Sequence, residues 1–257
     1  MRSARSLVLL GLVLAAATAQ AGDKVIIARV HKEGLEQTYL MKGDFELEFT
    51  GSTVNIEATL KQTCKGTVKE GDRKDTIAHI LEWTKMDITL DGQAMGDMDR
   101  LPPNSRIWLY PDGRIAALTV EGGGPEAEIA RLVATVLNVY VPPDGAEVGS
   151  TWKVPPSEAK TGAVPGTIEY KLAGVEDLAG TKAAKVRMEL KGEPRGDGES
   201  PMNVSADVWL DQASGSLLKG TATIESFAIQ SLIVNGTVRF EAKPKDTKNP
   251  ATAPVSP

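Results

Sequence analysis

The sequence predicts a mainly β protein, in which one large curved antiparallel sheet packs on a single amphipathic helix near residues 125–140. Two observations support this fold class. From Gly22 to about Lys243, short segments of alternating apolar and polar residues recur between turn-forming residues. One segment instead repeats its apolar residues every three or four positions, as a helix does.

Four strands follow from strict alternation, because each would have one face buried and one face in water. In the first, Phe45, Leu47 and Phe49 alternate with glutamates. The others end at turn-forming sequences such as Asp91-Gly92 and Asp211–Gly215. Their apolar positions are Met86, Ile88 and Leu90; Ala184, Val186, Met188 and Leu190; and Val204, Ala206, Val208 and Leu210.

A tight hairpin is predicted at Asn235-Gly236, a dipeptide that favours two-residue turns between strands. It lies between the apolar run Leu232–Val234 and the segment Thr237–Phe240. With this hairpin included, the pattern predicts on the order of ten strands.

The helix is predicted to begin after Gly122–Gly124. Pro125 suits a first helical position, and Glu126 and Glu128 suit a first turn. Pro142-Pro143 would end the helix. Its apolar stripe, which we expect to pack on the sheet, consists of Ile129, Leu132, Val133, Val136, Leu137 and Tyr140.

The two ends of the chain are predicted not to belong to the folded body. Arg2 and Arg5 precede an apolar run and then Ala19-Gln20-Ala21, the pattern of a secretory signal peptide over residues 1–21. That run has about half of the roughly 20 residues that cross a bilayer, so we expect no transmembrane span. No Cys follows the expected cleavage site, so we expect no lipidation. The Pro-rich tail, residues 244–257, is predicted to be disordered.

Residues 22–243 are predicted to form a single β-rich domain that contains a weak internal sequence repeat. The segment from Ile107 to Ile115 resembles the segment from Val208 to Leu217, since each has a Trp in a strand, then a tight turn, then a second strand. Duplication of a β-meander is one explanation, with halves of about 22–120 and 145–243. Chance recurrence of a common hairpin is the other.

Composition excludes several classes of protein. A net charge of −5 does not suit a nucleic-acid binder, which must neutralise phosphates. One Cys and two His leave no basis for a cysteine-based or multi-histidine metal centre. Nucleophile and phosphate-binding motifs are absent from the sequence. We therefore predict no catalytic residues, no metal site, no cofactor and no enzymatic activity.

The residues with reactive side chains have ordinary structural interpretations. Cys64 shares the parity of the apolar residues before it, which predicts a buried, inert thiol. His31 is expected to be exposed, and His79 to lie in a strand. The carboxylates around Asp87 and Asp97 do not match the spacing of a calcium loop. Three of the four Trp residues are expected to pack rather than to bind a ligand.

Two short motifs carry a resemblance to known exported proteins. Gly149-Ser150-Thr151-Trp152 is followed by a strand that contains Tyr170, Leu172 and Gly174. With the signal peptide and the helix, these resemble uncharacterised exported bacterial β-rich proteins and the half-barrel of the lipoprotein-carrier group, the LolA, LolB and LppX type. Carriers of this type hold acyl chains on a concave apolar face.

The resemblance implies a non-catalytic protein of the periplasm or the extracellular space. The predicted partner is a lipid or another apolar ligand between sheet and helix, contacted by the stripe Ile129 to Tyr140. The alternative is a structural or interaction component of the bacterial cell envelope, which would bind an envelope protein and no small molecule.

Overall fold

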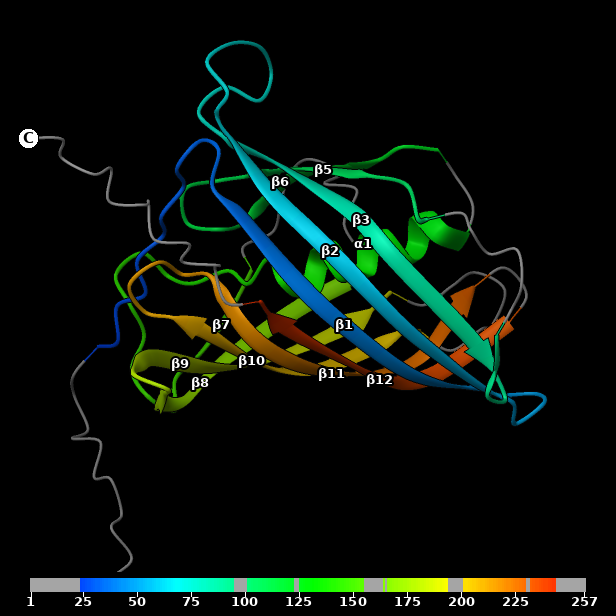
Figure 1. Ribbon diagram of the computed structural model, residues 1–257. Coiled ribbons are helices and arrows are strands. Elements are labelled where there is room, and N and C mark those ends of the chain that lie inside the picture. Colours follow the sequence, from blue (N-terminus) through cyan, green and yellow to red (C-terminus); the bar gives the residue numbers. More distant parts are fainter. Residues whose placement is uncertain are drawn as a thin grey trace, which may run out of the picture.

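The computed structural model describes residues 24–94, 101–122, 125–154, 164, 166–193, 201–229 and 232–243 (Figure 1). The predicted signal peptide and the Pro-rich tail lie outside these residues. Within them the fold is mainly β, as predicted. The elements are β1 (Glu36–Leu47), β2 (Thr53–Thr67), β3 (Ile77–Leu90), β4 (Gln93–Ala94), β5 (Ser105–Leu109), β6 (Ile115–Val120), α1 (Pro125–Leu137), β7 (Thr151–Lys153), β8 (Gly166–Leu178), β9 (Thr181–Gly192), β10 (Asn203–Asp211), β11 (Leu217–Ile229) and β12 (Leu232–Ala242).

All twelve strands described belong to one antiparallel sheet. The strand order is β6-β5-β3-β2-β1-β12-β11-β10-β9-β8-β7, with β4 paired to β3. The two halves of the chain meet where β1 pairs with β12, from Tyr39 opposite Ala242 to Leu47 opposite Val234. The sheet is not closed, because β6 and β7 lie at its two ends. Figure 1 shows it curving around α1, which confirms the predicted curved sheet on one helix.

The concave face of the sheet is apolar. Every second residue of the long strands points to this side, as Tyr39 and Met41 do in β1 and as Val204 to Leu210 do in β10. These side chains are almost fully buried and form one core with the side chains of α1. The alternation predicted for β9 and β10 is confirmed, since every predicted apolar position there is buried.

Helix α1 ends earlier than predicted, at Leu137, so Tyr140 lies beyond it. The side chain of Asn138 donates a hydrogen bond of 2.6 Å to the carbonyl of Ala134. The carbonyl of Val139 accepts a bond from Arg29, and that of Tyr140 accepts one of 3.0 Å from Trp152. One nearby side chain and two from other parts of the chain thus bind the carbonyls at and after the helix end, and the chain leaves the helix before reaching Pro142.

The hairpin predicted at Asn235-Gly236 is wrong. Strand β12 runs straight through this dipeptide, between β1 and β11. Steric crowding requires a glycine at position 236, because a Cβ atom on Gly236 would lie 2.3 Å from the carbonyl oxygen of Asp44 and 2.6 Å from Cδ1 of Phe45. Asn235 accepts a bond of 2.7 Å from the backbone of Ser226, where β11 changes register. Packing and a β-bulge decide this position, and not turn preference.

Of two expectations for the turns after β1 and β3, the turn at Asp91-Gly92 is confirmed and the burial of Phe49 is wrong. Asp91-Gly92 forms the predicted turn, with positive φ at both residues, and connects β3 to β4. Phe49, predicted to be buried, is 74% exposed. Strand β1 has ended at Leu47, whose carbonyl accepts a turn-closing bond of 2.8 Å from the amide of Gly51.

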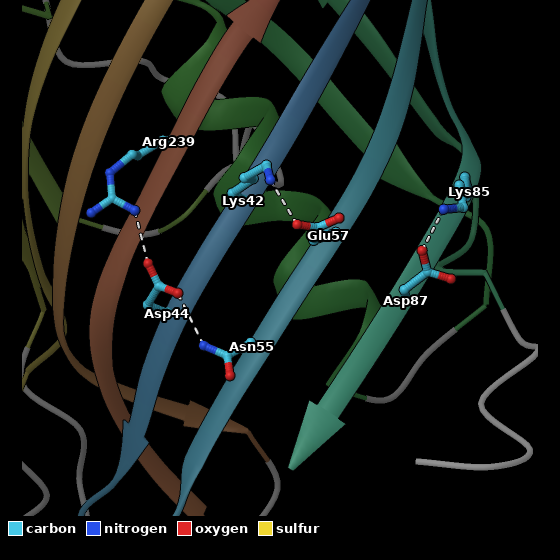
Figure 2. A network of polar contacts seen from close by, with 7 residues as sticks. All are labelled: Lys42, Asp44, Asn55, Glu57, Lys85, Asp87 and Arg239. Carbon is cyan, nitrogen blue, oxygen red and sulfur yellow. Dashed lines mark hydrogen bonds and ion pairs between the residues drawn. The ribbon is translucent and has the colours of Figure 1, made fainter. Parts of the chain in front are cut away.

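The outer face of β12, β1, β2 and β3 carries paired charges (Figure 2). Asp44 contacts Arg239 at 2.8 Å and Asn55 at 3.0 Å. Lys42 pairs with Glu57 at 2.7 Å, and Lys85 pairs with Asp87. The charged side chains are all solvent-exposed, so each ion pair adds little to stability. Asp87 is thus part of a solvent-exposed surface of paired charges, while Asp97 lies outside the described residues.

Candidate functional site

The predicted apolar stripe lies on the core side of α1. Leu132, Val133, Val136 and Leu137 are each 2–6% exposed, while Ile129 and Tyr140 are partly buried. They pack in the same core as the concave face of the sheet. The backbone of α1 is nearest to β5, β6 and β11. The stripe therefore contacts the sheet as predicted, and its role in ligand binding stays a prediction.

The N-terminal segment, residues 24–35, crosses one end of the curved sheet. Its backbone bonds in turn to three separate parts of the chain. Val25 pairs with Ala146, Ala28 and Val30 donate to the turn 212–214, and Gly34 donates to Cys64 at 2.9 Å. We call this end of the sheet the N-terminal end. The sequence did not single out this segment.

Arg29 is the central side chain of that segment. Its guanidinium donates to the carbonyl of Val139, after the end of α1, and to that of Gly215 at 3.3 Å. The carbonyls near a helix C-terminus carry partial negative charge, which favours a cation there. Burial lowers the pKa of Arg29 from its ordinary value, yet a guanidinium stays charged in proteins.

Two glycine turns enclose the Arg29 side chain. A Cβ atom on Gly113 would lie 2.9 Å from Cζ of Arg29, and one on Gly215 would lie 2.9 Å from its Cδ. Both glycines have positive φ, which other residues adopt at a cost. They belong to the two hairpins that resemble each other in the sequence, and in both hairpins the register shifts directly after the Trp. Duplication remains a prediction.

Two tyrosines on the concave face lie close enough to Arg29 to interact with it electrostatically. Burial raises the pKa of Tyr170 to about 12 and also raises the pKa of Tyr39, while the positive charge of Arg29 opposes both shifts. The ring of Tyr170 stacks on Trp152, with 5.9 Å between centroids. Both hydroxyls are therefore neutral, and they put polar groups into a mostly apolar interior.

The two histidines of the chain meet at this end, which sequence separation gave no reason to expect. The centroids of the two rings are 5.6 Å apart, and the rings meet edge to face. His31 is half-buried and not exposed as predicted, because the N-terminal segment folds over the sheet end. His79 is 8% exposed, and burial lowers its pKa to about 4, with the charges of His31 and Arg29 contributing. Burial and the charge of Arg29 also lower the pKa of His31.

A chain of contacts assigns the hydrogen on His79. The hydroxyl of Tyr39 donates to Oε1 of Gln62 at 3.5 Å, which leaves the amide nitrogen of Gln62 to face Nδ1 of His79 at 3.4 Å. An amide NH₂ is a donor, so Nδ1 accepts and the hydrogen of the neutral ring sits on Nε2. Nε2 of His79 is buried and has no partner in the structure, and the same is true of Nε2 of His31 and Nε of Arg29.

Cys64 is buried, as predicted. It lies directly opposite His79 in the β2–β3 register, so both side chains point to the concave face. Within the described parts of the chain, no three His, Cys, Asp or Glu side chains gather closely enough to hold a metal.

The opposite end of the concave face, at the β1–β2 hairpin, is apolar and less buried. Phe45, Leu47, Val54, Met86 and Ile88 all point to the concave side there and are partly exposed. We call these five residues the hairpin-end patch. The concave face thus has apolar side chains open to solvent at one end and a buried polar group at the other.

Comparisons with known proteins reveal similarity of fold. No protein-family model matches the sequence, and no curated protein matches it either. A structure that describes lipid–protein interactions in lipovitellin matches with a TM-score of 0.50 at 10% identity, over 84% of this chain and 26% of that chain. This chain therefore spans about a quarter of the lipovitellin chain.

Two bacterial structures also match, both with a TM-score of 0.27. One is a DUF1329 family protein from Desulfovibrio piger, with 7% identity over 82% of this chain and 84% of that one. The other is the lipoprotein LppX from Mycobacterium tuberculosis, with 9% identity over 82% and 85%. LppX is named in the group that the sequence resembles. Among the described residues, no helix is long and apolar enough to cross a membrane.

Proposed function

We propose that this chain is an exported, non-catalytic protein of the bacterial periplasm or extracellular space, not lipidated, that binds a lipid or another apolar ligand between its sheet and α1. The observation that carries the proposal is the concave face. It is apolar along every long strand, and its hairpin-end patch is partly open to solvent. Burying an acyl chain against such a surface is favourable by about 25 cal/mol per Å².

The comparisons support the same function. Lipovitellin, the neighbour with a TM-score of 0.50, is described by its interactions with lipid. A sheet that wraps one helix without closing gives a ligand an apolar surface on one side. The predicted signal peptide would bring the protein to the envelope, where lipids must cross an aqueous space.

The alternative is an envelope interaction protein without a small ligand. It is favoured by the stripe residues Leu132, Val133 and Val136, because they are already buried against the chain's own side chains. Under this alternative the exposed Phe49, beside the hairpin-end patch, would contact a partner protein.

Native mass spectrometry of the mature protein, purified from a bacterial periplasm, distinguishes the two. We expect a discrete added mass that disappears on organic extraction, and lipid in the extract. A mass equal to that of the bare chain, unchanged after incubation with lipid vesicles, would move the assignment to the alternative.

A matched pair of variants locates the binding surface on one strand. Leu47 points to the concave side at the hairpin end, whereas Leu40 points outward and is 38% exposed. We expect Leu47→Glu to lower the bound lipid fraction several-fold and Leu40→Glu to leave it unchanged. Equal lipid in both variants would refute the concave face as the binding surface.

A further inference from the structure

We propose that Arg29, His31 and His79 bind the anionic headgroup of an amphiphile, a carboxylate or a phosphate, whose apolar chain lies along the concave face. The inference rests on the proposed function and adds to it the chemical class of the ligand. It comes from the buried polar group at the N-terminal end of the sheet.

Three buried nitrogens at this end have no hydrogen-bond partner in the structure. They are Nε of Arg29, Nε2 of His31 and Nε2 of His79. Folded proteins pair nearly all of their buried polar groups, so three unpaired nitrogens in residues close enough to interact electrostatically indicate an occupant that accepts hydrogen bonds. Two of them come from a segment that crosses the sheet end and one from β3, so the occupant would also hold the segment to the sheet.

The charge of the occupant follows from Arg29. In the described part of the chain, Arg29 forms no ion pair with a carboxylate, and its guanidinium donates to the carbonyls of Val139 and Gly215. Asp112, which interacts with it electrostatically, is held by Arg114 at 2.7 Å. A buried cation without a counterion is costly, so an anion is the stabilising occupant.

The hydrogens are placed to suit an anion. Nε of Arg29 is always a donor, and the contact of Gln62 with Nδ1 makes Nε2 of His79 a donor as well. Burial and the charge of Arg29 lower the pKa of His31, but an anion beside it would favour its protonated form, in which Nε2 is a donor. A bound carboxylate or phosphate would thus accept from three nitrogens.

The position of these nitrogens suits an amphiphile better than a free anion. From His79 the concave residues of β3 continue through Leu81 and Trp83 to Ile88 in the hairpin-end patch. Nine residues of strand extend about 30 Å, which is long enough for a common fatty acyl chain. Tyr39 and Tyr170 would lie between the charged and the apolar parts of the ligand.

The test measures the affinity of delipidated mature protein for three amphiphiles with the same chain. These are palmitate, palmitoyl lysophosphatidic acid and uncharged monopalmitoylglycerol, with inorganic phosphate as the free anion. We expect the wild type to bind at least one charged amphiphile more than tenfold tighter than monopalmitoylglycerol. Comparison of palmitate with lysophosphatidic acid shows whether a carboxylate or a phosphate is preferred.

The variants are Arg29→Gln and, as a matched loss of one positive charge on the outer face, Arg239→Gln. We expect Arg29→Gln to abolish the preference for the charged headgroup while its affinity for monopalmitoylglycerol changes less than twofold. Arg239→Gln should keep the preference. A preference that survives Arg29→Gln, or that Arg239→Gln also removes, would overturn the inference.

A measurement on the wild type keeps the inference testable if Arg29→Gln does not fold. The chain has two histidines, so their ring signals are simple to follow by nuclear magnetic resonance. We expect the charged amphiphile to shift both sets of signals and monopalmitoylglycerol to leave them in place.

The outcomes separate the two proposals. Equal affinity for charged and uncharged amphiphiles would refute the headgroup site, while the proposed function of lipid binding would stand. If inorganic phosphate binds as tightly as lysophosphatidic acid, the site takes a free anion, and the inference that its ligand is an amphiphile is overturned. Failure of all three amphiphiles to bind refutes the proposed function itself.

Discussion

Replacing His79 by Gln should make the fold markedly less sensitive to acid. In the folded protein, burial, His31 and Arg29 lower the pKa of His79 to about 4, while an unfolded chain has a histidine pKa near 6.5. Between these values the unfolded state binds more protons than the folded state. Stability must therefore fall as the pH falls from about 6.5 to about 4, and it is retained above that range.

The size of the effect follows from the two pKa values. At about pH 4.5 the linkage relation gives a loss of about 2–3 kcal/mol relative to about pH 7.5 for this one side chain. The groups around His79 that carry or can carry charge are Arg29 and His31 from the N-terminal segment, with Tyr39 from β1 and Cys64 from β2. His31 titrates in the same direction, so the wild type loses at least this amount.

Urea unfolding, followed by tryptophan fluorescence at both pH values, measures the difference. The acid-induced loss in His79→Gln should be about 2–3 kcal/mol smaller than in the wild type. Carboxylates of the chain contribute equally to both proteins and cancel. Lys171→Gln, an exposed replacement on β8, should behave as the wild type does. If His79→Gln loses as much stability in acid as the wild type, His79 is not buried and neutral in the folded state.

Two further substitutions test the packing on which the site depends. Gly236→Ala should destabilise the fold by about 1–3 kcal/mol in urea unfolding, because its Cβ would lie 2.3 Å from the carbonyl oxygen of Asp44. The control is Gly174→Ala, where a Cβ meets nothing within 4 Å and stability should change by less than about 0.5 kcal/mol. Leu132→Ala should cost about 2–5 kcal/mol and Glu128→Ala, on the exposed side of α1, a few tenths. A Leu132→Ala protein as stable as the wild type would mean that the stripe does not pack on the sheet.

The part of the fold that could be predicted is the part that repeats locally. Alternation in β9 and β10 placed Val186, Met188, Val204 and Val208 on the buried face, because a strand's side-chain period is independent of its partners. The three-to-four spacing located α1 for the same reason. What alternation cannot indicate is where a strand stops. Phe49 fits the pattern but lies in a turn, and Asn235-Gly236 resembles a turn but lies in a strand.

The polar group at the N-terminal end could be predicted only in part. A usable signal existed for His79, which shares its parity with Ile77, Leu81 and Trp83 and so had to point to the concave face with them. Arg29 and His31 had no such signal, because the segment from Lys24 to Leu35 forms no regular element and its bonds reach residues more than a hundred positions away.

The contacts of Arg29 explain why no local pattern could reveal it. Its side chain is held by the turn at Gly113, the turn at Gly215 and the carbonyl after α1, and each of these becomes its neighbour only when the whole sheet has curved. A charge that can be buried only after the halves of the sheet come together costs stability unless something compensates it. The carbonyls compensate in part, and an anion would complete the compensation. Binding an anionic ligand should therefore stabilise the curved fold as a whole, since the ligand adds its binding energy to the folded state alone.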